Sequence, residues 1–440
     1  MYLRVFSFCA FLLLLPLTGF SQVIEDNLSR SGSIYSGFGL GMPVDINSSN
    51  TNGMGLSGVS TYSPFAPSLS NPAQWGKSEF SQGQVTLGLT AFNTSDSFAT
   101  AQNSRFSFES FQFVFPLLRS QLGASISFTP LTRTDFASVN TGTIENSNFD
   151  NNVDFITTTI GSGGINRIEF GLGYQFNDHI SIGYAASAYL STITEELTTN
   201  FSDLNFQRTG QAPVIDKSIK GAGFGNRFGL YTQADQLFRD NDRASFSATV
   251  NLPVNISSER SFETFRVVDG FNQRVQLADA SGSADGTIKL PLEFNSGVTY
   301  YLNPYHSFSA EYLFQNWNDS EFSYDLTEQG YYKDRSKVGV GYQYQPFMDQ
   351  QSSGFFSNFR YSIGATYDDG HLAIAGENIE TAMLHAGLTI PSARNRSSID
   401  ISFNYGVRGT ESNSLVKENI WGFKISLNLA EFMFLQQRFQ

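Results

Sequence analysis

The segment Ser398–Arg408, SIDISFNYGVR, indicates a β fold, because its residues alternate strictly between two kinds. Every second residue is apolar or aromatic, and the residues between them are polar or small. The stretch Trp421–Leu429, WGFKISLNL, repeats this pattern closer to the C-terminus. A period of two is the signature of a β-strand with one apolar face. The two apolar rows are Ile399, Ile401, Phe403, Tyr405 and Val407, and Trp421, Phe423, Ile425, Leu427 and Leu429.

The same alternation recurs along most of the chain and predicts fourteen strands in total. Nine more segments show it clearly, and three show it weakly. The clear segments are Val85–Ala91, Leu122–Phe128, Ile168–Phe176, Ile180–Leu190, Ala244–Leu252, Phe308–Phe314, Val338–Tyr344, Phe359–Tyr367 and Leu384–Ile390. The weaker ones are Arg105–Phe115, Gly223–Tyr231 and Leu290–Leu302.

Alternation alone fits both a soluble β-sandwich and a membrane β-barrel, because each has one apolar face. Two features favour the barrel. Short connections, such as Asn177–His179 and Asn303–Tyr305, alternate with long polar ones, as in outer-membrane barrels. The non-apolar face also carries charges that a wet lumen tolerates and a dry core does not. The predicted long loops are Pro130–Ile165, Ser191–Gly221, Asn255–Gly286 and Asn316–Ser336, and the charges are Arg167, Glu169, Lys337, Arg360, Asp400 and Lys424.

The first 21 residues have the pattern of a secretory signal peptide. A positive start is followed by the apolar stretch Val5–Phe20, and small residues precede a cleavage site after Ser21. The alternative is a membrane anchor helix. Removal of this segment leaves 419 residues (440 − 21), a net charge of −14, and no cysteine, because Cys9 lies within the signal. The mature protein is therefore expected to fold without disulfides.

Composition and motif spacing argue against several classes of protein. The chain carries 27 Lys+Arg against 40 Asp+Glu, which gives no basic footprint for nucleic acid. Gly53-x-Gly55-x-x-Gly58 matches the dinucleotide fingerprint by letters, but no strand–turn–helix surrounds it. The four histidines lack metal-ligand spacing. We therefore expect no enzymatic activity and no cofactor, although a Ser/His/Asp or Asn set on the outer wall, as in barrel enzymes, remains an alternative.

The segment from Gln22 to about Phe80 precedes the first strand and lacks its alternation. It is rich in Gly, Ser, Asn and Pro, yet it has regularly placed apolar residues, including Tyr35, Leu40 and Trp75. A fourteen-stranded barrel would leak unless its lumen were filled. The segment is therefore predicted to be a plug or hatch, with a disordered periplasmic tail as the alternative.

The N-terminal motifs resemble the hatch of the FadL family, whose members are outer-membrane transporters of long-chain fatty acids and aromatic hydrocarbons. The C-terminal half is similar to family members from Bacteroidetes-type bacteria. The sequence departs from the family pattern at Gln74-Trp75 after the Asn-Pro-Ala motif, and at the C-terminus, where Phe439 is penultimate. The matching motifs are Gly32–Ser36, Gly39–Asp45, Gly53–Gly58, Asn71-Pro72-Ala73, Asn316-Trp317, Tyr405–Gly409 and Glu418.

This resemblance implies an all-β, fourteen-stranded antiparallel transmembrane barrel plugged by an N-terminal hatch. The implied domains are a signal peptide (1–21), a hatch (22–80), a barrel with long extracellular loops (81–435) and a short tail (436–440). It also implies capture of a ligand among the outer loops, a hydrophobic pocket above the hatch, and lateral exit through a gap in the wall. The candidate hatch residues are Gly53, Gly55, Gly58, Asn71, Pro72 and Ala73.

Two further sets of residues are candidates for steps of this route. Pro130 follows the strand Leu122–Phe128 and lacks an N–H, so it could interrupt strand pairing and open the wall. A plain strand end is the alternative for this proline. Aromatic and basic residues in the predicted loops could capture an anionic amphiphile, with ordinary packing at the rim as the alternative. These capture candidates are Phe201, Phe206, Phe262, Phe265, Arg208, Lys217 and Arg260.

The expected function is uptake of hydrophobic solutes across the outer membrane of a Gram-negative bacterium. The alternatives are a structural or secretion-system partner barrel and a general diffusion porin, although the hatch argues against the porin. The expected partners are a hydrophobic small molecule, outer-membrane lipid, lipopolysaccharide and the barrel-assembly machinery. Because a closed barrel has no free edges, we expect a monomer.

Overall fold

The computed structural model describes residues 32–64, 66–97, 99–144, 153–201, 213–268, 271–274, 285–324, 331–347, 354–392 and 397–431. The predicted signal peptide, the C-terminal tail 436–440, Phe206 and Arg208 lie outside these ranges. Within them, no helix has the length and apolarity needed to cross a bilayer.

Fourteen antiparallel strands of the described residues close into a barrel, which confirms the predicted fold class. The barrel closes where the first strand, β2, pairs with the last, β22, over fifteen residue pairs from Ser81↔Glu431 to Ser95↔Lys417. The wall strands are β2 (Ser81–Ser95), β3 (Thr100–Leu118), β4 (Leu122–Arg133), β6 (Val153–Asn177), β7 (Ile180–Phe201), β8 (Pro213–Asp235), β9 (Arg243–Asn251), β13 (Glu293–Asn303), β14 (His306–Gln315), β16 (Arg335–Tyr344), β17 (Arg360–Asp368), β20 (Thr381–Pro391), β21 (Ser398–Arg408) and β22 (Lys417–Glu431).

Shorter elements complete the described chain. β9 and β13 are each continued beyond a proline-containing break by another strand, and several 3-10 helices lie in the N-terminal segment and in connections. The short strands are β1 (Met42–Pro43), β5 (Phe136–Ile144), β10 (Val254–Val268), β11 (Phe271–Arg274), β12 (Asp285–Leu290), β15 (Glu321–Phe322), β18 (Ala373–Ile374) and β19 (Glu377–Asn378). The 3-10 helices are η3 (Ile34–Gly37), η4 (Ser49–Met54), η5 (Pro72–Lys77), η6 (Trp317–Asp319), η7 (Phe356–Asn358) and η8 (Ser412–Ser414).

The wall has its apolar side chains outside and its polar side chains inside. In β21, Ile399 and Phe403 are exposed, whereas Asp400 and Ser402 are buried. In β6, Phe170 is 56% exposed, while its neighbour Glu169 is 1% exposed. This inversion of the soluble pattern places lipid around the barrel and polar groups in its lumen. The short turns lie at the end where β2 begins and β22 ends, which is therefore the periplasmic end.

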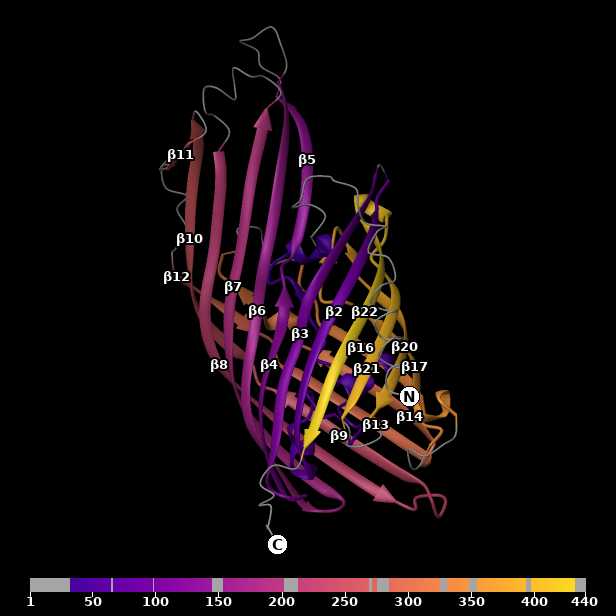
Figure 1. Cartoon of the computed structure of the whole chain (residues 1–440). Helices are drawn as coiled ribbons and strands as arrows, with labels where there is room; N and C mark the ends of the chain where they lie inside the picture. Colours follow the sequence, from indigo (N-terminus) through magenta and orange to yellow (C-terminus); the bar gives the residue numbers. More distant parts are fainter. Residues whose placement is uncertain are drawn as a thin grey trace.

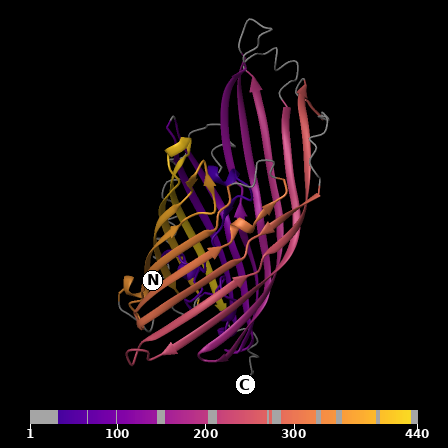
Figure 2. The same ribbon diagram turned by 180° about the vertical axis from the view of Figure 1, so that it is seen from behind.

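Three neighbouring strands are much longer than a membrane requires. β6, β7 and β8 have 25, 22 and 23 residues, whereas about 9–11 residues suffice to span a bilayer. Figures 1 and 2 show these strands rising well above the rest of the barrel, with β5 and β10 beside them. We call this part of the wall, formed by β5, β10 and the outer halves of β6–β8, the outer sheet.

Candidate functional site

The N-terminal segment runs through the lumen from the outer end to the periplasmic end. At the outer end, the Gly32 N–H donates to the carbonyl of Asp135. At the periplasmic end, helix η5 lies against β6 and β7, and the Ser78 carbonyl accepts from the N–H of Ser120 in the β3–β4 turn. The indigo segment inside the barrel in Figure 1 is this part of the chain. The described part of the predicted hatch therefore occupies the lumen along its length.

A buried glutamate of the wall holds the middle of this segment. The Glu311 carboxylate accepts from the backbone N–H groups of Ser57 (2.7 Å), Gly58 (2.9 Å) and Val59 (2.8 Å). It also accepts from the Ser57 hydroxyl at 2.7 Å. Gly58 has a φ of +81°, and this left-handed turn makes successive N–H groups converge into an anion-binding nest. The wall thus supplies the anion, and the plug supplies the nest.

A second glutamate holds the outer end of the segment in a similar way. The Glu418 carboxylate on β22 accepts from the Ser33 hydroxyl at 2.9 and 2.8 Å and from the Ile34 N–H at 3.0 Å. Ser33 is the N-cap of η3, so the carboxylate lies at the start of a short helix. Arg408 of β21 lies 3.4 Å from the same carboxylate. Two wall glutamates therefore bind the plug through backbone N–H groups and serine hydroxyls.

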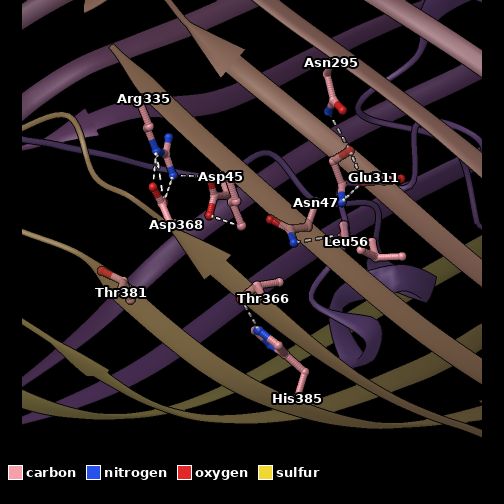
Figure 3. Close-up of polar contacts among 12 residues, drawn as sticks. Asp45, Asn47, Leu56, Asn295, Glu311, Arg335, Thr366, Asp368, Thr381 and His385 are labelled. Atoms are coloured by element: carbon pink, nitrogen blue, oxygen red, sulfur yellow. Dashed lines mark hydrogen bonds and ion pairs between the residues drawn. The ribbon is translucent and has the colours of Figure 1, made fainter. Parts of the chain in front are cut away.

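The third anchor has the opposite polarity, because the plug provides the carboxylate. Asp45 lies 2.8 Å from Arg335 and 2.5 Å from Lys337 on β16. Arg335 also binds Asp368 of β17 through two nitrogens, as Figure 3 shows. Burial disfavours the ionised form of Asp45, but Lys337 and Arg335 outweigh it and hold the pKa of this carboxyl well below its usual range. Asp45 therefore stays ionised, and its ion pairs persist, over the physiological pH range.

Two of the predicted hatch residues, Gly53 and Gly55, pack closely against the wall, whereas Gly58 packs against Thr51 and Ser48 of the plug. A Cβ on Gly53 would lie 2.4 Å from the Cα of Gly387, and one on Gly55 would lie 2.3 Å from the His385 ring. Gly55, like Gly58, has a positive φ, here +68°. Only glycine suits such a position without strain. Gly53 and Gly55 let the plug backbone approach the wall, and the role of all three glycines in gating stays a prediction.

The second predicted hatch motif forms the start of η5. The Asn71 amide donates to the carbonyls of Val59 (3.0 Å) and Leu230 (3.1 Å). Its Oδ1 accepts from the Ala73 N–H at 2.9 Å, which is an N-cap contact. Pro72 occupies the first position of the helix and lies against Gly183 of β7. Asn71 therefore ties together the helix, the middle of the plug and the wall.

Sequence reasoning missed the wall glycines that make room for the plug. A Cβ on Gly183 would lie 2.2 Å from Pro72, one on Gly123 2.0 Å from the Trp75 carbonyl, and one on Gly364 2.1 Å from the Met54 carbonyl. All three occupy inward positions in strands with apolar residues on the other face. The sequence pattern that could have indicated them is a glycine at an inward position of a strand that is otherwise rich in β-branched or aromatic residues.

The wall pairing is interrupted between β3 and β4. These strands pair only from Leu118↔Leu122 to Phe111↔Phe128. Further outward, β3 continues with β2 alone, while β4 pairs with plug strand β1 through Met42↔Arg133 and Pro43↔Thr132. We call this interruption the seam. The plug therefore completes the sheet where a wall strand pair is missing.

Pro130, the candidate wall kink, lies on β4 at the seam. It is two residues beyond Phe128, the last residue of β4 that pairs with β3. The register of β4 against β6 also shifts between Pro130 and Thr132. A proline cannot donate a hydrogen bond to a neighbouring strand, so its position fits an interrupted ladder. Its role in lateral exit stays a prediction.

A charged chamber lies inside the seam. This cavity of about 170 Å³ is lined by residues of the plug, β3, β4 and the β20–β22 wall. Glu109 of β3 lies 3.3 Å from Arg133 and 3.6 Å from Lys424. A dry cavity of about 150 Å³ holds a benzene molecule when its lining is apolar, but this lining combines apolar side chains with charged ones. Its charged residues are Asp45, Arg105, Glu109, Arg133, Lys337, Arg408 and Lys424.

An apolar cluster lies on the other side of the same plug segment. Leu40, fully buried, packs with inward-facing residues of β6, β7, β8, β10 and β12. The Leu40 N–H donates to the Tyr332 hydroxyl at 2.8 Å, and Leu131 of β4 packs on the cluster next to the seam. Plug and loop side chains thus fill the apolar part of the lumen. The buried members are Leu40, Ile165, Tyr189, Ile193, Ile219, Val254, Ile256, Ile288, Leu290, Trp317, Phe322 and Tyr324.

The five capture candidates within the described residues lie on strands, not in loops, so the prediction of loops at these five positions was wrong. Phe201 is on β7, Lys217 on β8, and Arg260, Phe262 and Phe265 on β10. Threonine-rich, β-branched segments continue the strands beyond the membrane, although they had indicated polar loops. The structure does not describe the side chain of Phe265.

Four of the capture candidates share the inner face of the outer sheet. Lys217 is directly opposite both Phe262 and Glu195 in the register, and its Nζ lies 3.3 Å from the Glu195 carboxylate. Phe201 is paired with Phe155 across β6 and β7, with ring centroids 6.4 Å apart. Arg260 lies opposite Ile219, a member of the apolar cluster. This face therefore leads from the outside down to the cluster.

Lys77, at the periplasmic end of the plug, makes the docking of η5 sensitive to pH. Burial, followed by the nearby Arg243 charge, lowers the pKa of Lys77 from 10.5 to about 8. The unfolded chain then binds more protons than the folded one between pH 8 and 10.5, so stability rises with pH in this window. As the pH rises from 8 to 10.5, we expect η5 to become more resistant to digestion by a protease that does not cleave at lysine. Lys77→Met should abolish this dependence, and an unchanged pH profile in the variant would contradict the assignment.

Solved structures with this fold include two toluene transporters and a FadL homologue. The toluene transporter TbuX of Ralstonia pickettii has a TM-score of 0.52 at 15% identity, covering 92% of this chain and 100% of that one. The toluene transporter TodX of P. putida has a TM-score of 0.53 at 15% identity, covering 83% and 93%. A Pseudomonas aeruginosa FadL homologue has a TM-score of 0.55 at 13% identity, covering 88% and 98%.

These likenesses confirm the FadL-type resemblance at the level of the fold. A search of curated proteins gave no match. The family model described as BamG matches residues 7–440, almost the whole chain. The chain belongs to the BamG family.

Proposed function

We propose that the protein is an outer-membrane channel that takes up hydrophobic solutes and releases them sideways through the seam. The observation that carries this proposal is the pairing of plug strand β1 with β4 where β3 no longer pairs with it. A closed β-barrel satisfies its backbone hydrogen bonds around the whole wall. Here β4 pairs with plug strand β1 in place of β3. A movement of the plug would therefore open or close the barrel wall at this point.

The apolar cluster is the second observation in favour of this proposal, because it indicates that the solute is hydrophobic. The inner face of the outer sheet leads to Ile193 and Ile219, and these pack around Leu40 of the plug. Burial of each CH₂ group contributes about 0.8 kcal/mol, so an acyl or aromatic solute would favour this lining over water. Entry would require Leu40 and Tyr332 to move aside. The hydrophobic pocket implied by the resemblance would then form only when a solute displaces these side chains.

The movable part of the plug would be the short segment that contains β1. It lies between two anchors, Glu418 at Ser33–Ile34 and Arg335–Lys337 at Asp45. Only two residue pairs join β1 to β4, and Gly39 and Gly41 flank Leu40 with φ of +56° and +83°. A local swing of this segment would open the seam while the buried anchors stay in place. Gly53, Gly55, Gly58 and Asn71–Ala73 would form the fixed part of the hatch.

A disulfide that locks β1 to β4 tests this proposal. Pro43→Cys and Thr132→Cys are direct partners in the register, and Cys9 is the chain's one natural cysteine. We expect oxidation to reduce uptake of toluene and of a radiolabelled long-chain fatty acid at least tenfold, with recovery after reduction. The matched control joins β2 to β22 through Gln84→Cys and Asn428→Cys, and it should leave uptake unchanged. Full uptake with a completely formed β1–β4 disulfide would contradict release through the seam.

A partner barrel is the second candidate function, and the outer sheet favours it. This sheet rises well above the rest of the barrel, which solute capture alone does not require. The partners would be the barrel-assembly machinery together with lipopolysaccharide and outer-membrane lipid. Deletion of Asn71–Ala73 separates the two functions, because a channel would lose selective uptake whereas a partner barrel would still co-purify with its partner.

A further inference from the structure

The chamber inside the seam is lined by more basic than acidic side chains. Five of its lining residues are arginine or lysine, and two are aspartate or glutamate. Two further carboxylates contact these bases from outside the lining. Glu418 lies 3.4 Å from Arg408, and Asp135 lies 3.8 Å from Arg105. The bases still outnumber the acids by five to four, so the electrostatic potential of the chamber favours an anion.

Two of the arginines that line the chamber have hydrogen-bond donors to spare. Among the described residues, the Nε–H groups of Arg105 and Arg133 are buried and have no acceptor. The Arg105 guanidinium lies over the Phe92 ring, with its Cζ 5.7 Å from the ring centroid. A buried donor without an acceptor is destabilising, so such groups normally have a partner. An anion between the two arginines would supply acceptor oxygens.

The size of the chamber and its donors fit a phosphate group better than a carboxylate. A cavity of about 150 Å³ holds the six carbon atoms of benzene, so the five heavy atoms of a phosphate fit in about 170 Å³. Arginine binds phosphate oxygens in a bidentate manner. A carboxylate has only two oxygens, and the Glu109 carboxylate already lies 3.3 Å from Arg133 and 3.6 Å from Lys424. The remaining donors therefore favour an anion with more oxygens.

The wall beside the chamber has a charged inner side and an aromatic outer side. The Arg133 Nη2 group donates to the Phe108 carbonyl at 2.9 Å, so this side chain lies across the seam from β4 to β3. On the outer surface of β3, Phe106 is 72% exposed and Phe108 is 41% exposed. A membrane lipid likewise combines a charged head group with apolar chains. The seam therefore fits a lipid whose head group lies inside the wall.

We propose that the chamber binds a phosphate group, which belongs either to a lipid head group that enters through the seam or to free phosphate. Arg105, Arg133 and Lys424 hold the phosphate oxygens, and the chains of a lipid stay outside on Phe106 and Phe108. The phosphate competes with Glu109 for Arg133 and Lys424, so its binding loosens the contact that Arg133 makes across the seam. The lipid route rests on the proposed function, whereas phosphate binding itself does not.

Isothermal titration calorimetry of the purified barrel in dodecyl maltoside tests the proposal, with inorganic phosphate, dihexanoylphosphatidic acid and hexanoate as probes. We expect both phosphates to bind and hexanoate to bind at least tenfold more weakly. Lys424→Gln and Arg105→Gln should each weaken phosphate binding at least tenfold, as expected for the loss of one charge-assisted hydrogen bond. Tighter binding of the phosphatidic acid than of inorganic phosphate identifies a lipid as the source, and equal or weaker binding identifies free phosphate.

Lys417→Gln is the matched control, because Lys417 is on the same strand as Lys424 but on its opposite face, away from the chamber. Its effect should be less than twofold, and heat-modifiable migration in gels should show that all three variants fold. Three results would each overturn the proposal: no phosphate binding, hexanoate binding of equal affinity, or phosphate binding that Lys424→Gln and Arg105→Gln leave unchanged. A barrel that takes up toluene without binding phosphate would overturn this inference alone, and one that binds phosphate without taking up solutes would overturn only the proposed function.

Discussion

Glu311→Gln should release the middle of the plug while leaving the barrel intact. The carboxylate accepts four hydrogen bonds, three from consecutive backbone N–H groups and one from Ser57. Glutamine offers one acceptor oxygen and turns its NH₂ group toward the remaining donors. Hydrogen bonds to charged groups contribute about 1.5–3 kcal/mol each, and loss of two should cost the docked state about 3–6 kcal/mol.

Hydrogen exchange measures this release directly. We expect amide protection of Ser57–Val59 to fall at least a hundredfold, and channel openings in planar bilayers to become more frequent. Glu259→Gln is the matched control, because this glutamate lies exposed on the outer sheet. If Glu311→Gln kept full protection at Ser57–Val59, the carboxylate would not be an anchor of the plug.

The barrel could be predicted from the sequence, because the alternation of apolar and polar residues appears within each strand. Period-two alternation in Ser398–Arg408 is set by the strand's own geometry, and the polar row that faces the lumen can be assigned from the apolar row that faces lipid. The ends of the strands could not be predicted in the same way. β6–β8 continue as threonine-rich segments outside the membrane, where no lipid imposes an apolar face.

The anchors of the plug could not be predicted, because they join distant parts of the chain. Alternation places Glu311 on the inward face, but its partner Ser57 lies 254 residues away. Every residue type except proline has a backbone N–H group, so the sequence does not show which N–H groups bind a carboxylate. Gly58 is the one indication, because glycine permits the positive φ of the nest. The capture candidates could be predicted in part. Their aromatic and basic residue types suggested a binding role, but the sequence does not show that they share one face, because this depends on the register of β7, β8 and β10.

Gly183→Val should open the periplasmic end of the lumen. A Cβ at this position would lie 2.2 Å from the Pro72 carbonyl carbon and 2.3 Å from the Ala73 nitrogen. Backbone atoms of η5 cannot yield as a flexible side chain does, so the helix must leave its site. The wall itself should tolerate the change, because Gly183 has no positive φ and valine favours strands. Displaced η5 would expose Lys77 to trypsin from the periplasmic side.

We therefore expect rapid tryptic cleavage at Lys77 and a several-fold higher conductance in planar bilayers. Gly83→Val on β2 is the matched control, since the nearest atom to its added Cβ lies 3.6 Å away. Gly364→Val, whose Cβ would lie 2.1 Å from the Met54 carbonyl, should instead disturb the plug near η4 and spare Lys77. If Gly183→Val and Gly83→Val behaved alike, η5 would not be the closure of the periplasmic end. If Gly183→Val alone opened the lumen, the plug would consist of separable parts, with η5 able to leave while Glu311 still holds Ser57–Val59.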